Sequence, residues 1–345
     1  SRKYHENAGV QAEQVKIGFM KMDFHSASDL GEILAGVGFR MDISQLSPGA
    51  LNGSIAIGGS SATPILSMQT DRTLLFQGDR RAGKLPFSLN TTTAHPVVRG
   101  EASQPASLHG FQANLSDAFF QMPAGAHIKV ALVCQARLER LVTAGSHHGV
   151  LELIERSNTA QLNPRGFQQL VELIQPIAAD DTQTDLIEAA LLEALTPENL
   201  ESTFCGNLSL RAELMKDLVA WGYANPQKAI TLNELSNTIF ASRSSIVHSC
   251  RVTFGVGPMS LLKQIRLGQA QRALSSSVLQ KSLQCTTVQE VANYYGFNSR
   301  NHFARDYRNQ FGEAPSQTLQ RASDPGMSCQ SVAVAHRPQM AMALR

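Results

Sequence analysis

Two short stretches near the C-terminal end carry arginine, asparagine and histidine side chains at spacings that place them on one face of a helix. Arginine and asparagine have paired donors and acceptors that match the guanine and adenine edges exposed in the major groove. The chemistry indicated is therefore hydrogen bonding to double-stranded DNA. The candidate DNA-contacting residues are Arg243, Ser244, Val247, His248 and Arg251 in the first stretch, and Arg300, Asn301, His302, Arg305 and Arg308 in the second.

The opposite face of each stretch is apolar at positions i, i+4 and i+8, which predicts a buried stripe on an amphipathic helix. The predicted stripes are Ile246, Cys250 and Phe254 in the first stretch and Phe303, Tyr307 and Phe311 in the second. A polar helix face by itself can be merely solvated. Two such helices with matching apolar stripes favour a shared binding role.

The two stretches belong to a repeat. Ser242-Arg243 and Phe254-Gly255 recur as Ser299-Arg300 and Phe311-Gly312, and a proline follows each copy at the same distance. The pattern T-x-x-E precedes each copy, at 231–234 and 287–290. This pattern predicts a capping box, in which the threonine hydroxyl and the glutamate carboxylate satisfy each other's backbone N–H groups. Each copy therefore predicts a short capped helix, a tight turn and a second helix, which is the unit that presents a helix to the major groove.

Residues 207–322 resemble the DNA-binding domain of the AraC/XylS family of transcription regulators. The resemblance is carried by the segment from Ser242 to Pro258, by Lys263–Ala270, and by Ala292–Phe297 followed by Phe303–Arg308 and Phe311–Ser316. It implies an all-α domain with two helix-turn-helix units joined by a long helix. It also implies promoter DNA and RNA polymerase as partners, a small-molecule effector and a homodimer. The segment 297–319 is similar to the ethanolamine-operon regulators of this family.

The first copy departs from the family pattern. Val247 and His248 stand where members usually carry polar or basic residues, and Cys250 replaces an aromatic core residue. We therefore expect the second helix to dominate the choice of DNA sequence.

The distribution of charge agrees with this interpretation. The whole chain has a formal net charge of only +2. Residues 207–322 contain 13 Lys and Arg against 6 Asp and Glu, whereas the rest of the chain contains 17 against 22. A basic block beside an acidic remainder is typical of a DNA-binding module attached to a second domain.

Residues 1–135 contain short apolar runs separated by Gly, Pro, Asn and Ser clusters, which favours an all-β sandwich or barrel. The predicted strands are 15–22, 53–58, 63–68, 73–77, 109–113 and 128–134, and residues 29–38 are predicted to form a short helix. The family resemblance implies a cupin-like domain that senses an effector. The sequence does not indicate which residues bind it.

Within residues 136–206 the apolar spacing predicts four helices. Apolar residues recur at steps of three and four residues over 137–144, 150–156, 164–173 and 185–195. In the family such helices connect the domains and form a dimer, whereas the alternative is packing against the barrel. Residues 323–345 contain Pro, Gly, Ser and Met without a period, and we expect a disordered tail. The predicted fold class is α+β.

Other classes of function find little support in the sequence. The five cysteines lack a C-x-x-C spacing and the histidines lack an H-x-H pair, so neither a zinc site nor another metal site or cofactor is predicted. No nucleophile elbow or phosphate-binding loop is present. No apolar run is long enough to span a membrane, so we expect a cytoplasmic protein. Two alternatives remain: a cupin-type enzyme with an accessory DNA-binding domain, and an architectural DNA-binding protein without an effector.

Overall fold

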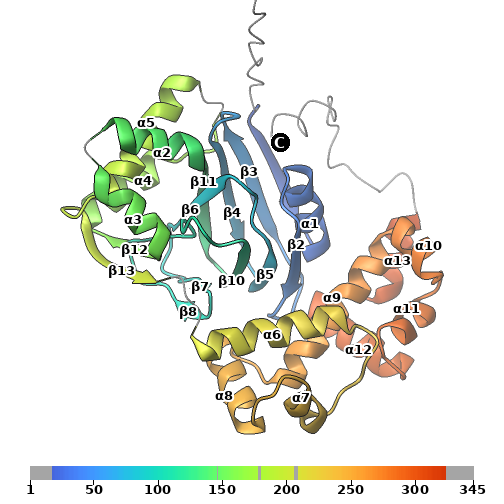
Figure 1. Ribbon diagram of the computed structural model, residues 1–345. Coiled ribbons are helices and arrows are strands. Elements are labelled where there is room, and N and C mark those ends of the chain that lie inside the picture. The colour runs from blue at the N-terminus through green and yellow to red at the C-terminus, as the bar shows by residue number, and fades with distance from the viewer. Residues whose placement is uncertain (1–17, 146, 178–179, 206–208, 324–345) are drawn as a thin grey trace, which may run out of the picture.

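The computed structural model describes residues 18–145, 147–177, 180–205 and 209–323. The N-terminal part of the chain is built on two antiparallel sheets (Figure 1). The larger sheet has the strand order β1-β3-β4-β11-β6-β9-β12-β13, and the smaller sheet has the order β2-β5-β10-β7-β8. An apolar cluster, including Phe24, Ile55, Phe76 and Leu132, lies between the sheets. This arrangement confirms the predicted β-rich domain and the α+β fold class.

The strands of the larger sheet are β1 (Met20–Phe24), β3 (Gly53–Gly59), β4 (Pro64–Thr70), β6 (Lys84–Asn90), β9 (Ser107–His109), β11 (His127–Cys134), β12 (Ser157–Leu162) and β13 (Leu200–Cys205). The strands of the smaller sheet are β2 (Met41–Gln45), β5 (Leu74–Asp79), β7 (Val97–Val98), β8 (Glu101–Ala102) and β10 (Asp117–Met122). The strands predicted at 53–58, 63–68, 73–77 and 128–134 are confirmed. The prediction at 15–22 is confirmed from residue 20 onwards, and its residues 15–17 lie outside the described residues.

The strand predicted at 109–113 is wrong, because β9 ends at His109. Gly110 has a φ of 94°, a left-handed conformation that interrupts an extended strand, and its N–H donates to the carbonyl of Asn158. Strands β2, β6, β7, β8 and β10 were not predicted. The helix predicted at 29–38 is α1 (Ala27–Gly36), which begins at the cap Ser26.

Residues 136–206 contain the four predicted helices and two strands that the sequence did not indicate. The helices are α2 (Gln135–Ala144), α3 (His148–Arg156), α4 (Pro164–Leu173) and α5 (Asp181–Ala194). Strands β12 and β13 extend the larger sheet, and β12 pairs directly with β9. Leu138, Leu170 and Leu191 share one buried cluster with Phe87 of β6. These helices therefore pack against the larger sheet.

The C-terminal part is helical. It consists of α6 (Leu210–Ala224), α7 (Leu232–Thr238), α8 (Arg243–Phe254), α9 (Pro258–Ser275), α10 (Ser277–Leu283), α11 (Val288–Tyr294), α12 (Arg300–Phe311) and α13 (Pro315–Ser323). The sequence did not predict α10 and α13. Of the tail expected to be disordered, residues 324–345 lie outside the described residues.

Within the described residues, none of the helices is both long and apolar enough to cross a membrane. In the same part of the chain, no group of three or more His, Cys, Asp or Glu side chains is placed to hold a metal ion.

Candidate nucleic-acid interface

Both predicted capping boxes are present, at the N-termini of α7 and α11. The hydroxyl of Thr231 accepts from the N–H of Glu234, and the carboxylate of Glu234 accepts from the N–H of Thr231 at 2.8 Å. Thr287 and Glu290 make the same reciprocal pair, with the carboxylate 2.9 Å from the Thr287 nitrogen. Backbone hydrogen bonds lower the pKa of both glutamates because they stabilise the ionised carboxylate; the donors are the N–H of Thr231 for Glu234, and the N–H groups of Thr286 and Thr287 for Glu290. Each first helix is thus fixed at its start.

The second helices, α8 and α12, are matched from end to end. Ser242 and Ser299 cap their N-termini through side-chain hydrogen bonds. Both helices end at a glycine in the left-handed conformation, with φ of 73° at Gly255 and 75° at Gly312. A left-handed glycine satisfies the last carbonyls of a helix without a steric penalty. The repeat in the sequence is therefore a repeat in the backbone.

The two apolar stripes form the cores of the two units. Ile246, Cys250 and Phe254 are buried in one cluster, and Phe303, Tyr307 and Phe311 are buried in another. Burial raises the pKa of the Cys250 thiol to about 12, so this cysteine is an apolar core residue.

Helix α9 joins the two units and contributes to both cores. Leu262 and Ile265 belong to the first cluster, whereas Leu267 and Leu274 belong to the second. The helix has 18 residues, which corresponds to a length of about 27 Å. A continuous helix buried in both cores holds the two units at a fixed separation.

Side chains on α9 also hold the second unit directly. The guanidinium of Arg266 lies 5.4 Å from the ring centre of Phe297, a cation–π contact. Lys263 pairs with Asp306 of α12 at 3.2 Å. The hydroxyl of Tyr307 is 2.8 Å from that of Thr318, which ties α12 to α13.

The structure places the candidate DNA-contacting residues on the outer sides of α8 and α12. In α8 these are Arg243, Ser244, Val247, His248 and Arg251, and in α12 they are Arg300, Asn301, His302, Arg305 and Arg308. All are exposed except Val247, which is half-buried. Each set lies on one helix, and the two sets belong to separate units.

The exposed faces of α8 and α12 differ in how firmly an arginine on each is held. Arg243 donates to the side-chain oxygen of Asn233 in α7 at 2.9 Å, which holds it against its own unit. Arg305 lies 3.7 Å from Asp306, a long and exposed ion pair that contributes little energy. The guanidinium of Arg305 is therefore held less firmly than that of Arg243. That the second helix dominates sequence choice stays a prediction.

The N-terminal domain is docked on the two units and leaves their outer faces open. The side-chain amides of Gln45 and Gln310 donate to each other's backbone carbonyls, at 3.0 and 2.8 Å. Gln264 of α9 donates to the carbonyl of Leu46 at 2.8 Å. Phe119 of β10 contacts Phe254 edge-on, with the ring centres 6.3 Å apart.

Sequence analysis missed these docking residues. Gln310 lies on the buried side of α12, next to the apolar stripe. A polar residue at such a position is a signal from which a buried hydrogen bond could have been predicted. Sequence analysis also missed Asn233 of α7, which accepts a hydrogen bond from Arg243. It did not single out Val252 and Asn309, which are exposed at equivalent positions of α8 and α12.

The turns of the two units differ at one strained position. Phe240, between α7 and α8, has a φ of 52°, and the corresponding turn between α11 and α12 has Gly296 with a φ of 76°. The left-handed conformation costs a non-glycine residue roughly 1–2 kcal/mol. The side chain of Phe240 is 94% exposed, so packing does not compensate for this strain.

We expect Phe240→Gly to stabilise the protein by up to about 1 kcal/mol. Relief of the left-handed strain exceeds the extra backbone entropy that glycine loses on folding, about 0.5–1 kcal/mol. Urea unfolding of the two proteins measures the difference. The control is Ala241→Gly, one residue further, where φ is not positive. That change should be neutral or destabilising, and a loss of stability in Phe240→Gly would contradict the argument.

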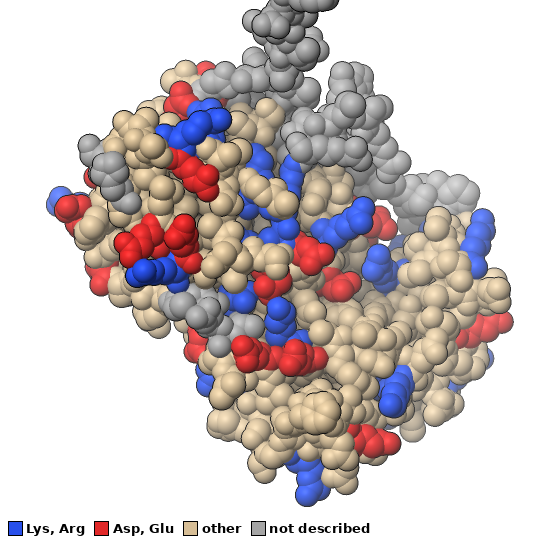
Figure 2. All heavy atoms as spheres, in the orientation of Figure 1, with Lys and Arg blue, Asp and Glu red and all other residues tan. Residues whose placement is uncertain are grey.

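Figure 2 shows basic and acidic side chains side by side on the face that it presents. The positive excess of residues 207–322 is therefore not gathered into one patch on this face.

Comparisons with known proteins agree with this geometry. Residues 235–321 match a family model described as a helix-turn-helix domain. The chain is similar to XylDLEGF operon transcriptional activator 3 of Pseudomonas putida, with 27% identity over 177 residues. This match covers 48% of the chain and 50% of that relative, so the chain spans about half of the relative's length. XylDLEGF operon transcriptional activator 2 of the same organism is 28% identical over 137 residues, which are 39% of the chain and 82% of the relative.

Among solved structures, a probable AraC family transcriptional regulator from Rhodopseudomonas palustris is 35% identical. The match covers 32% of the chain and 97% of that protein, with a TM-score of 0.29. The family model covers the two units described above, and both curated relatives are transcriptional activators. The chain belongs to the AraC/XylS family of transcription regulators and carries that family's DNA-binding domain with two helix-turn-helix units.

Proposed function

We propose that this protein regulates transcription by binding a specific promoter sequence, with α8 and α12 in successive segments of the major groove. The observation that carries the proposal is the pair of matched units, each with an exposed polar face, held apart by one continuous helix. Two readers on one rigid frame fit half-sites about one helical turn apart, roughly 34 Å along the DNA.

Affinity and specificity come from different contacts in this proposal. Lys and Arg contacts to phosphates supply affinity through the release of counterions, and these contacts carry no sequence information. Arg300, Asn301 and Arg305 would read base edges from the second helix. Arg243, Ser244, His248 and Arg251 would do so from the first.

The test is selection of bound duplexes from a random pool by the 345-residue chain, followed by footprinting. We expect two protected half-sites in successive major grooves and stronger base preference under α12 than under α8. Affinity for the selected site should fall as salt rises, with a slope on logarithmic axes that reflects several released counterions. An architectural DNA-binding protein would yield no preferred sequence. A cupin-type enzyme with an accessory DNA-binding domain would show a catalytic activity besides DNA binding.

Activation, with RNA polymerase as partner, is part of the proposal because both curated relatives are named transcriptional activators. A promoter fused to a reporter tests the sign of regulation. Loss of expression on removal of the protein supports activation, whereas increased expression indicates repression.

Dimerisation through residues 136–206 is also proposed. Leu141 of α2 is 37% exposed and Leu186 of α5 is 56% exposed. The ion pair between Arg137 and Asp185 joins these two helices. A second copy of the chain would cover these apolar side chains. Analytical sedimentation of the wild type and of a Leu186→Glu variant measures whether the chain is a dimer and whether the dimer depends on Leu186.

A further inference from the structure

The β2–β3 turn, residues 46–52, lies against the C-terminal end of α12. The N–H of Gly49 donates to the carbonyls of Asn309 and Gln310, which lie 3.2 and 3.1 Å away. Carbonyls in the last turn of a helix have no partner within the helix itself. A turn of the N-terminal domain therefore caps the second helix of the second unit.

Gln45, the last residue of β2, closes this contact. Its side-chain nitrogen donates to the carbonyls of Ser47, Gly49 and Gln310, at 2.8, 2.7 and 3.0 Å. The side chain of Gln310 donates in return to the carbonyl of Gln45 at 2.8 Å. Both glutamines are buried, and a buried amide that loses its partners is costly. These hydrogen bonds hold the β2–β3 turn in one position on α12.

The β2–β3 turn is also fixed within its own domain. The N–H of Leu46 donates to the carbonyl of Thr73, and the N–H of Thr73 donates to the hydroxyl of Ser47, both at 2.8 Å. The ring of Pro48 restricts a backbone torsion of the turn. The turn therefore moves together with the smaller sheet.

The glycines that end α8 and α12 have the same conformation but different surroundings. A Cβ atom added to Gly312 would lie 2.9 Å from the backbone nitrogen of Ala50, so the turn approaches α12 as closely as a residue without a side chain allows. At Gly255, among the described residues, nothing lies within 4 Å of the corresponding position. The turn thus caps α12 alone.

The next residue of the turn contacts the first unit. Leu46 is buried in the cluster that contains Phe254 of α8, and its carbonyl accepts from Gln264 of α9 at 2.8 Å. Gln45 and Leu46 are neighbours in the chain, yet one is bound to the second unit and the other is packed in the core of the first. A single turn therefore bridges the two units.

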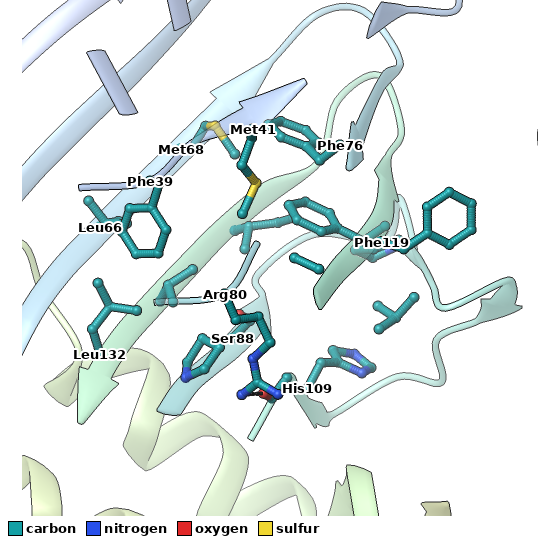
Figure 3. A pocket seen from close by; sticks show the side chains of 18 of the residues that line it. Phe39, Met41, Leu66, Met68, Phe76, Arg80, Ser88, His109, Phe119 and Leu132 are labelled. Atoms are coloured by element: carbon teal, nitrogen blue, oxygen red, sulfur yellow. Dashed lines mark hydrogen bonds between the residues drawn. The ribbon is translucent and has the colours of Figure 1, made fainter. Parts of the chain in front are cut away.

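Strand β10 adds a further contact with the first unit. Phe119 points away from Phe76, as Figure 3 shows, and its ring contacts Phe254 edge-on with the ring centres 6.3 Å apart. Its neighbour Phe120 stacks on Phe76 between the sheets, because successive side chains of a strand point to opposite faces. The N-terminal domain is thus anchored on the first unit while its turn caps α12.

This bridge supplies a restraint that α9 does not. Helix α9 fixes the separation of the two units, but two bodies joined along one helix can still rotate about it by small sliding movements of the packed side chains. The β2–β3 turn contacts both units away from the axis of α9. It therefore resists a rotation of α12 relative to α8.

We propose that the β2–β3 turn determines which spacing between two half-sites the protein accepts on DNA. This inference rests on the proposed function, since it concerns the same two half-sites. One base pair inserted between them moves a half-site by about 3.4 Å along the DNA and by about 34° around it. Gln45 is a positioning residue in this proposal, because it acts through α12 and not on the DNA.

The test measures the affinity of the 345-residue chain for the selected duplex and for duplexes with one base pair added or removed between the half-sites. We expect the wild type to bind the selected spacing at least about 10-fold more tightly than either neighbour, because rigidly held helices reach a displaced half-site only if the DNA is deformed. The result is this ratio of affinities for one protein preparation, so an inactive fraction of the protein cancels.

Gly312→Ala is the decisive variant, because its Cβ displaces the backbone of the turn. We expect the ratio to fall to about 3-fold or less once the angle of α12 is free to follow the DNA. Gly255→Ala is the matched control. It places alanine in the same left-handed position at the end of α8 with equal backbone strain, but it meets no neighbour among the described residues. This control should keep the wild-type ratio.

Gln45→Ala loosens the same contact from the N-terminal side without a change in α12, and it gives the comparison if Gly312→Ala does not fold. Its control is Gln69→Ala, which truncates an exposed glutamine on β4. Gln45→Ala should lower the ratio of affinities, and Gln69→Ala should leave it unchanged.

Three results would overturn the inference: a wild type that binds all three spacings equally, an unchanged ratio in Gly312→Ala and Gln45→Ala, or an equal fall in Gly255→Ala. A uniform rise in affinity at every spacing in Gln45→Ala would also overturn it, because the turn would then only hinder DNA binding. A chain that selects a sequence but accepts any spacing refutes this inference alone, whereas a chain that selects no sequence refutes the proposed function with it.

Discussion

Replacement of Phe254 by alanine is expected to lower the free energy of unfolding by about 3–5 kcal/mol, the range for removal of a buried phenylalanine ring. Phe254 ends α8, is 6% exposed, and contacts Phe119 of the N-terminal domain as well as the core of its own unit. The change therefore leaves a cavity in a cluster that both domains share. Urea unfolding followed by far-ultraviolet circular dichroism measures the loss.

The matched control is Phe240→Ala, because the chain offers a second phenylalanine a few residues away that is 94% exposed. Its truncation should change stability by no more than about 0.5 kcal/mol, as is usual for exposed side chains. Similar losses in both variants would show that the cluster around Phe254 is not the source of the stability.

Arg305→Ala is expected to weaken binding to the selected DNA by about 1–3 kcal/mol, or roughly 5- to 150-fold, and to weaken binding to random DNA much less. Arg305 is exposed on the outer face of α12, opposite the buried Phe303 and Tyr307. Its weak pairing with Asp306, at 3.7 Å, leaves the guanidinium available for a guanine edge. Competition titrations with specific and random duplexes at one salt concentration measure both losses.

The control for Arg305 is Arg140→Ala, which removes the same charge from α2 in the N-terminal domain. That variant should bind both duplexes as the wild type does. If Arg305→Ala loses affinity equally for specific and random DNA, the side chain contacts a phosphate and does not read a base.

The sequence by itself determined the two helix-turn-helix units. Their signals are local: a capping box at each start, a glycine at each end and an apolar stripe between, all set within one or two helical turns. The stripes at Phe303, Tyr307 and Phe311 and at Ile246, Cys250 and Phe254 are therefore buried as predicted. The same holds for the four helices of residues 136–206, whose apolar spacing is also local, and α4 and α5 in addition have side-chain caps at Asn163 and Asp180.

The tertiary structure alone decided how the N-terminal domain is completed. Strands β12 and β13, with the sequences SNTAQL and LESTFC, contain few apolar residues, and they are strands because they pair with β9 and with each other. Strand formation depends on such partners, which lie far away in the sequence. The docking of Gln45 on Gln310 spans 265 residues, and no local pattern at either residue specifies the other.

A cavity of about 150 Å³ between the two sheets was equally invisible to sequence analysis. Met68, Phe76 and Leu132 read as ordinary core residues of separate strands, and Arg80 reads as one more charge in a turn. The packing of two sheets brings these side chains around one space and leaves the Nε of Arg80 without a partner. Local chemistry thus specified the two helix-turn-helix units, whereas long-range packing decided how the other domain is built and where it touches them.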